Sequence, residues 1–152
     1  EQIAIQKAIQ TPIQRSQWLR FYSGGNMRKV ECPYCLKLAD LVTGERIYPH
    51  RADLHSLQFY LCSDCNAYVG CHKRSNGAPL GRLANAELRA AKNKAHFFFD
   101  RIWKLRHKSR SAAYQWLSKE LGIPAKDCHI GMFDIALCNR TAAICSNYLS
   151  NK

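Results

Sequence analysis

The sequence is short of acidic residues and of long apolar runs. Its 152 residues include 11 Asp and Glu against 23 Lys and Arg, which gives a formal net charge of +12. No window approaches the roughly 18 consecutive apolar residues that a membrane-spanning helix needs. There is also no glycine-rich phosphate loop, no nucleophile elbow and no cluster of carboxylates. These absences exclude a membrane helix and the enzyme classes that depend on those motifs.

The positive charge is concentrated in one segment. Residues 27–70 hold five basic and five acidic residues, whereas residues 71–110 hold eleven basic and two acidic residues. A local basic surface of this kind attracts polyanions. The segment therefore predicts a surface that binds nucleic acid, either DNA or RNA. The alternative is a solvated helix face that has no partner.

Four of the eight cysteines form two C-x-x-C pairs, Cys32/Cys35 and Cys62/Cys65. Structural zinc takes four ligands in a tetrahedron, and a C-x-x-C turn presents two thiolates to one side of the ion with little strain. Two such turns predict one Zn²⁺ held by four thiolates. The alternative is redox-active or buried cysteine pairs. We disfavour it because thioredoxin-like motifs occur singly within a βαβ pattern, which is missing here.

The other cysteines show no matching pairs. Cys71-His72 and Cys128-His129 are candidates for further metal ligands. Four thiolates already complete a tetrahedral site, so we expect neither pair to bind the metal. The cysteine usage argues against a secreted disulfide framework and favours a reducing compartment, a cytoplasm.

Residues 1–26 form an N-terminal extension that is rich in glutamine and has no cysteine. The run Ser23-Gly24-Gly25-Asn26 before Met27 can be encoded by a ribosome-binding sequence just ahead of a start codon. We hypothesise that the natural protein starts at Met27. The alternative is an N-terminal arm with one or two helical turns.

Residues 27–81 are predicted to be a small zinc-ribbon-like β module. Residues 41–43 and 46–48 are β-type and flank Gly44, which predicts a hairpin. The alternation of residues 57–61 predicts a strand that leads into the second cysteine pair, and β-type residues also follow that pair. Such a small module cannot bury enough surface by itself, so zinc must contribute folding free energy.

Residues 82–152 are predicted to form three helices packed as one unit with the module, at about 83–105, 111–121 and 133–149, which makes the chain α+β. Gly122 and Pro124 end the second helix. Residues at three- and four-residue steps are the expected core: Ala84, Leu88, Ala91, Ala95, Phe98, Ile102 and Leu105; Ala113, Trp116, Leu117 and Leu121; Phe133, Leu137, Ile144 and Tyr148.

The basic residues of the first helix fall outside its apolar face, and others precede it in the chain. These side chains could neutralise phosphates along a nucleic-acid backbone. The candidate nucleic-acid-binding residues are Lys73, Arg74, Arg82, Arg89, Lys92, Lys94, Arg101 and Lys104.

A long string of motifs carries a family resemblance over residues 31–138. It includes Cys32-Pro33-Tyr34-Cys35, Tyr48-Pro49-His50-Arg51, Val69-Gly70-Cys71-His72, Leu83-Ala84-Asn85-Ala86-Glu87-Leu88-Arg89 and Cys128-His129-Ile130-Gly131-Met132-Phe133-Asp134. The chain resembles the zinc-finger-containing domain family of bacteriophages, prophages and bacteria. The resemblance implies a zinc finger and a phage or prophage setting in a bacterial host cell, and it implies no activity.

Two alternatives to non-enzymatic nucleic-acid binding stay open. In HNH nucleases two zinc knuckles frame a catalytic histidine, and His50 lies between the pairs here. Pro49 occupies the position where that motif usually has an aspartate, and the residues after Cys65 are strand-like where that motif requires a helix. We therefore assign no catalytic residue and keep His50 as the alternative. The other alternative is a protein-interaction module that docks on an acidic host protein.

Overall fold

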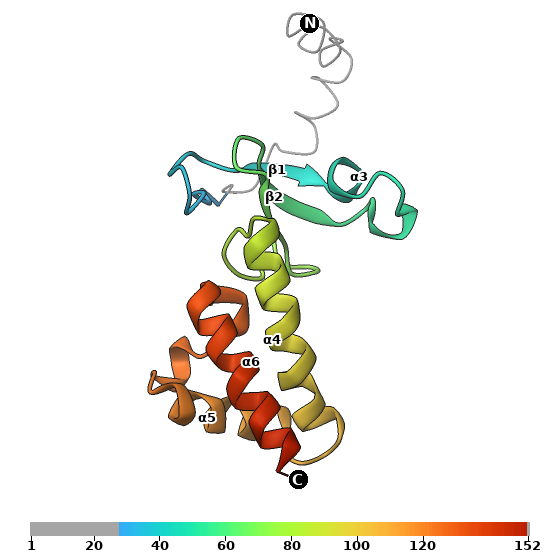
Figure 1. Cartoon of the computed structure of the whole chain (residues 1–152). Coiled ribbons are helices and arrows are strands. Elements are labelled where there is room, and N and C mark those ends of the chain that lie inside the picture. Colours follow the sequence, from blue (N-terminus) through green and yellow to red (C-terminus); the bar gives the residue numbers. More distant parts are fainter. Residues whose placement is uncertain (1–27, 152) are drawn as a thin grey trace, which may run out of the picture.

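The structure is a computed structural model that describes residues 28–151 (Figure 1). The N-terminal extension of residues 1–26 lies outside the described residues, so the hypothesis of a start at Met27 stays a prediction. In the described part, a small sheet lies across one end of the molecule and three helices extend away from it (Figure 1). Within residues 28–151, no helix combines the length and the apolarity that a membrane crossing requires.

The sheet has three antiparallel strands in the order β1-β2-β3. They are β1 (Asp40–Thr43), β2 (Gln58–Cys62) and β3 (Ala67–Gly70). The central strand β2 is covered on both faces, because its last four residues are all buried. Its aromatic and apolar residues suit a strand in this position. The predicted strands before and after the second cysteine pair are confirmed.

The predicted hairpin at Gly44 is wrong. Residues Gly44–Ile47 form the short helix α3, and the partner of β1 is β2, with Asp40 opposite Leu61. A 3-10 turn at Ala52–Leu54 completes the connection. A Cβ at Gly44 would collide with the Leu54 carbonyl. This glycine therefore permits a close backbone approach within the connection and does not form a tight turn between two strands.

Three main helices follow: α4 (Ala86–Lys104), α5 (Arg110–Leu121) and α6 (Ile135–Ser150). Each begins at a residue whose side chain accepts a hydrogen bond from a first-turn amide: Asn85, Ser109 and Asp134. α5 ends at Gly122, whose φ of 70° lies in the left-handed region that glycine tolerates. The α+β architecture with three helices is confirmed, and two 3-10 turns, at Ala125–Asp127 and Ile130–Met132, lie between α5 and α6.

Helices α4 and α6 pack side by side along most of their length, and α5 packs across their far end (Figure 1). The face of α4 toward α6 buries Leu88, Ala91, Ala95, Phe99 and Ile102. The expected core position Phe98 is therefore displaced by one residue, since Phe99 is fully buried and Phe98 only partly. Leu105, also expected in the core, is 58% exposed because the helix ends at Lys104.

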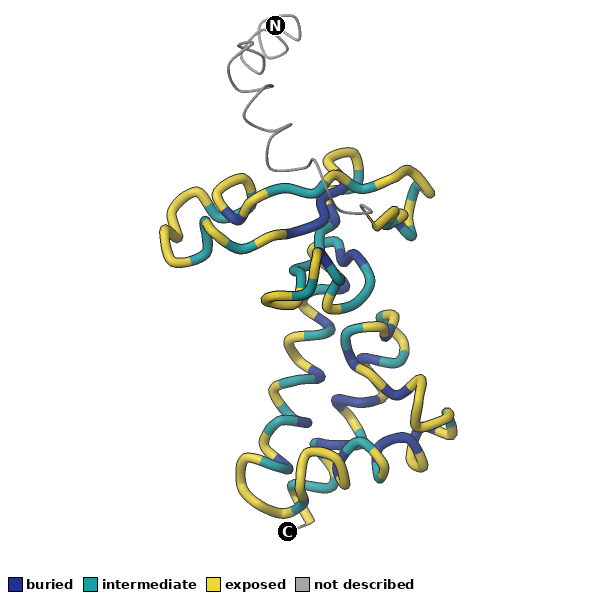
Figure 2. Tube along the Cα trace, turned by 180° about the vertical axis from the view of Figure 1, so that it is seen from behind, coloured by how far each residue is buried: buried dark blue, intermediate teal, exposed yellow. Residues whose placement is uncertain are grey.

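In α6 the buried face consists of Cys138, Thr141, Ala142 and Cys145. The larger expected residues Leu137, Ile144 and Tyr148 pack partly buried against the core from its edge. Small residues occupy the centre because α4 and α6 lie so close together, and the sequence pattern alone had pointed to the larger neighbours. The tube view shows buried residues along the facing sides of these helices (Figure 2).

The sheet and the helices meet at the loop before α4. Tyr68 of β3 forms a two-hydrogen-bond bridge with Ala84. The Arg82 amide donates to the Gly131 carbonyl at 3.1 Å, and Lys92 Nζ donates to the same carbonyl at 2.7 Å. A Cβ at Gly81 would collide with that carbonyl as well. A glycine at position 81 thus permits close backbone contact between the two parts.

Candidate metal centre and basic surface

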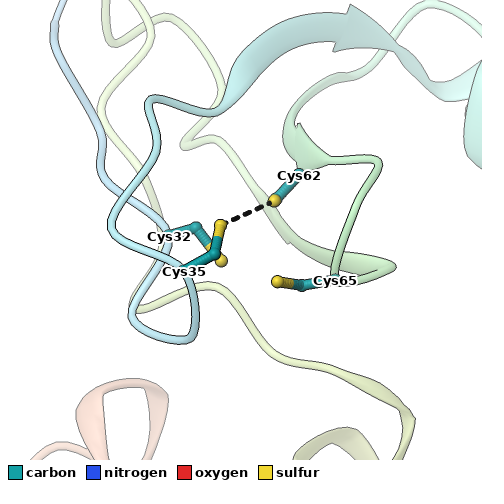
Figure 3. A group of neighbouring side chains, drawn as sticks. All are labelled: Cys32, Cys35, Cys62 and Cys65. Atoms are coloured by element: carbon teal, nitrogen blue, oxygen red, sulfur yellow. Dashed lines mark hydrogen bonds between the residues drawn. The ribbon is translucent and has the colours of Figure 1, made fainter.

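The four cysteines of the two C-x-x-C pairs converge. Cys32, Cys35, Cys62 and Cys65 place their Sγ atoms within 4.8 Å of one another, and Figure 3 shows the side chains pointing toward a common centre. A tetrahedron with zinc–sulfur bonds of about 2.3 Å separates its sulfurs by about 3.8 Å. The Cys35–Cys62 separation of 3.6 Å fits that spacing. The donor set and the geometry are those of a structural Zn²⁺ site.

The first knuckle is a tight turn held by backbone hydrogen bonds. The Cys32 amide donates to the Lys37 carbonyl at 2.8 Å, and the Leu36 amide donates to the Cys32 carbonyl at 2.9 Å. Leu36 has a φ of 63°, in the left-handed region. The chain can thus turn directly after Cys35, so that both sulfurs of the pair stay on the same side of the turn.

The second knuckle closes the β2–β3 hairpin. Cys62 ends β2 and pairs with Ala67, the first residue of β3. Asn66 directly follows Cys65 and has a φ of 47°, so it corresponds in position and conformation to Leu36 of the first knuckle. Asparagine tolerates this conformation better than most residues. The pairing of β1 with β2 then brings the two knuckles together.

The thiols of the cluster hydrogen-bond to one another. This bonding, chiefly to Cys35, together with desolvation raises the pKa of the Cys65 thiol to about 12. Such a thiol ionises at neutral pH only when a cation takes the place of the shared proton, which is what zinc does when it binds thiolates. The convergence of the four sulfurs therefore suits a metal ion, while the pKa of the thiol is lowered at Cys32 and raised at Cys65.

A salt bridge spans the two knuckles at the surface. Lys37 Nζ lies 2.6 Å from Asp64 Oδ2, and both side chains are more than half exposed. Lys37 follows the first pair and Asp64 lies inside the second, so the contact joins the same two turns that the metal joins. Exposed ion pairs contribute little free energy, so the metal dominates this junction.

The chain matches the model of a family described as a zinc-finger-containing domain, over residues 28–148. It belongs to that family. The match covers both knuckles, the sheet and nearly all of α6, so the metal centre and the helices are parts of one family unit. Comparison with curated proteins and with solved structures found no match. The family and the four-cysteine geometry together establish a zinc-binding protein.

The remaining cysteine and histidine candidates lie away from the cluster. Cys71 follows β3, is partly exposed and pairs with Pro79 in an isolated bridge. Cys128 is buried in the helical core, and His129 stacks on Tyr114 with ring centroids 6.2 Å apart. His72 is exposed in the loop after Cys71. Within residues 28–151, the four-cysteine cluster is the only group of three or more metal-ligating side chains.

The candidate basic residues divide into two groups. Lys73, Arg74, Lys94, Arg101 and Lys104 are exposed. The first two lie in the loop after β3, and the other three lie on α4. The remaining three, Arg82, Arg89 and Lys92, are partly buried at the junction of sheet and helices.

Two of the partly buried cations are bound by backbone carbonyls. Arg89 donates to the Ala84 carbonyl at 2.6 Å and to the Asn66 carbonyl at 3.3 Å, and its guanidinium lies 4.0 Å from the Tyr68 ring centroid. Lys92 donates to the carbonyls of Gly131 and Arg82. Burial, with a smaller contribution from Arg82, lowers the pKa of Lys92. Both side chains hold the junction together.

His50 lies in an exposed turn of the connection between β1 and β2. The residues after Cys65 form β3, as expected, where the nuclease motif requires a helix. Within the described part of the chain, His50 is in no group of metal-ligating side chains. The geometry therefore gives no support to an HNH-type site at His50.

One exposed aromatic residue of the basic segment, Phe97, is not among the candidates predicted from the sequence. Phe97 is 58% exposed, with the Arg101 guanidinium 5.0 Å from its ring centroid. Trp103 has both Lys104 and Arg110 near its ring, at 5.4 and 5.7 Å. The apolar periodicity predicts burial for Phe98 alone, and only the packing against α6 shows that Phe99 is the buried ring and that Phe97 is exposed.

Proposed function

We propose that this protein is a zinc-dependent, non-enzymatic nucleic-acid-binding protein of phage or prophage origin. The observation that carries the proposal is the exposed positive charge of residues 71–110. Seven basic side chains of this segment are exposed, while its acidic residues number two. They are Lys73, Arg74, Lys94, Arg101, Lys104, Arg106 and Arg110. Charge of one sign at this density favours a polyanionic partner. The phage or prophage origin rests on the family resemblance.

The exposed cations are spread along the segment. Lys73 and Arg74 lie in the loop after β3, Lys94 lies near the middle of α4, and the other four lie in its last turn and beyond its end. A helix of 19 residues is about 28 Å long. Basic side chains that are spread over such a length can contact several successive phosphates of a single strand or a duplex.

Two aromatic rings accompany these cations: Phe97, which is 58% exposed, and Trp103, which is partly buried. Phe97 lies beneath Arg101, and Trp103 lies between Lys104 and Arg110. Proteins that bind single strands combine such rings with cations, because a base stacks on the ring while the backbone meets the charge. The zinc centre contributes indirectly: it holds β3, and hence the loop with Lys73 and Arg74, in a defined place.

A fluorescence-anisotropy titration of the zinc-loaded protein with labelled single- and double-stranded DNA and RNA tests the proposal. Backbone contacts predict an affinity that falls steeply with salt. The variant Arg101→Gln should weaken binding and lower the slope of log K against log salt by about one. The matched control is Arg46→Gln, since Arg46 is an exposed arginine of α3 outside the basic segment.

The absence of binding to any of these nucleic acids at low salt would contradict the proposal. Equal losses in Arg101→Gln and Arg46→Gln would contradict the assignment of the α4 face and indicate nonspecific charge attraction. A pull-down from host lysate, with and without nuclease treatment, separates the alternative of an acidic protein partner. A partner that is retained after nuclease treatment would favour that alternative.

A further inference from the structure

A groove lies between the sheet and α4, outside the zinc centre. It has a volume of about 470 Å³, which is within the range of small-molecule sites. The residues that line it come from the connection after β1, from β2 and β3, from the loop before α4, from α4 itself and from Gly131. It therefore forms where the two parts of the molecule meet.

One side of the groove is aromatic. Tyr48, Phe59 and Tyr68 pack edge to face, with ring centroids 5.8 to 6.3 Å apart. The hydroxyls of Tyr48 and Tyr68 are 3.0 Å apart and hydrogen-bonded. These three residues, the aromatic wall, are held in place by one another and by the sheet. Phe59 is buried, and the Arg89 guanidinium lies 4.0 Å from the Tyr68 ring centroid. Tyr48 is therefore the ring of this wall that can offer a surface to a planar ligand.

The other side of the groove is basic. Arg82, Arg89 and Lys92 line it together with Asn93 and His96, and none of the lining residues is acidic. Within residues 28–151, the three cations form no ion pair with a carboxylate. Backbone carbonyls and the Tyr68 ring hold Arg89, and backbone carbonyls hold Lys92, so no negative charge offsets the mutual repulsion of the three cations, and an anion placed among them would relieve it.

Several residues that line the groove have unused hydrogen-bond donors. The Arg82 side chain makes no hydrogen bond or ion pair with any residue of 28–151. Lys92 uses two of its three N–H groups on carbonyls, and the Asn93 side chain is unpaired within the same range. Guanidinium and ammonium groups together with an amide are suitable donors for phosphate oxygens.

We propose that this groove binds a nucleotide, with the base against the aromatic wall and the phosphate beside Arg82 and Lys92. The inference rests on the proposed function, because the nucleotide in the groove is part of a bound nucleic-acid strand. An unpaired nucleotide of a single strand can enter the groove, whereas a stacked base pair cannot present its base face to the wall. The groove thus confers a preference for single strands over duplex.

The experiment compares Arg82→Gln with Arg46→Gln, each of which removes one arginine charge. The anisotropy titration uses a labelled oligothymidylate and a blunt duplex of the same length. Arg82→Gln should bind the single strand about five- to tenfold more weakly and lose the preference for it. Arg46→Gln should keep the preference. Zinc content and melting temperature establish that both variants fold.

A second measurement locates the ligand. Titration of the ¹⁵N-labelled protein with thymidine 5′-monophosphate should shift the backbone amide signals of Arg82, Asn93 and Gly131, and inorganic phosphate alone should shift them less. Shifts with the mononucleotide in a protein that binds no oligonucleotide would support the groove and overturn the proposed function. Unshifted signals, or an unchanged strand preference in Arg82→Gln, would overturn the groove.

Discussion

The zinc module and the helical part of this molecule are stabilised by different means. Among the described residues, the buried cluster of the module consists of Cys32, Tyr60, Cys62, Ala67 and Leu83, two of which are metal ligands. The buried cluster of the helical part contains fourteen residues and joins all three helices. A cluster as small as the first cannot offset the loss of chain entropy, whereas the second resembles an ordinary core. The metal therefore replaces a hydrophobic core in the zinc module, whereas the helical part has a core of its own.

Removing zinc should have the largest effect. A structural zinc site contributes roughly 10–16 kcal/mol of apparent binding free energy in zinc-finger peptides. We expect a strong chelator, or Cys62→Ser, to abolish the amide signals of the sheet while the helical circular-dichroism signal is largely retained. A metal assay should find one zinc per chain. The control is Cys71→Ser, which lies outside the cluster. A sheet that persists in chelator would contradict the comparison.

The second-largest effect is expected when a large side chain in the helical core is truncated. Phe99 is fully buried between the helices, so Phe99→Ala should lower the free energy of unfolding by about 3–5 kcal/mol, through lost burial and the cavity left behind. Denaturant titration measures it. The neighbouring Phe97→Ala, at a 58% exposed position, should cost less than about 1 kcal/mol. Zinc content should be unchanged in both, and a loss of zinc in Phe99→Ala would show that the two parts are not separately stabilised.

A substitution at the junction tests whether the two parts depend on each other. The added Cβ of Gly81→Ala would meet the Gly131 carbonyl, so the backbones must move apart. We expect a loss of about 1–3 kcal/mol in denaturant titration, the usual range for overpacking. Amide signals at Arg82 and Gly131 should shift. An unshifted Gly131 signal would argue against the close approach.

At the end of α4 a smaller effect of opposite sign is expected. Arg106 has a φ of 60°, where glycine is the favoured residue after a helix. Arg106→Gly should therefore raise the free energy of unfolding by up to about 1 kcal/mol and weaken nucleic-acid binding. Arg106→Ala removes the same charge but retains the unfavourable backbone conformation. It should therefore weaken nucleic-acid binding without raising the free energy of unfolding. Equal stabilities of the two variants would refute the backbone explanation.

The smallest effect is expected at the ion pair between the knuckles. Lys37 and Asp64 have side chains that are 70% and 60% exposed. Lys37→Met should change the free energy of unfolding of the zinc-loaded protein by less than about 1 kcal/mol in thermal or denaturant melts. A larger loss, or a measurable drop in zinc content, would mean that this contact aligns the knuckles before the metal binds.

Sequence patterns gave correct predictions where the local structure depends on residues that are close together in the chain. The C-x-x-C spacing predicted the ligands, and the apolar periodicity together with Gly122 predicted α5. The hairpin at Gly44 failed because the glycine is needed for a contact with Leu54, ten residues away. The apolar periodicity of the helix fits two neighbouring faces, one with Phe98 and one with Phe99, and the sequence analysis predicted burial of Phe98. Only the position of α6 decides that the face with Phe99 is buried.

The sequence by itself determined the zinc ligands, the strands on either side of the second cysteine pair, the three main helices, and the surplus of positive charge in residues 71–110, because spacing, periodicity and charge are properties of neighbouring residues. Only the tertiary structure decided which of those cations hold the junction and which face solvent. It also decided that Tyr48, Arg82 and Lys92 line one groove. These residues are far apart in the chain, and only the packing of the sheet against α4 brings them together.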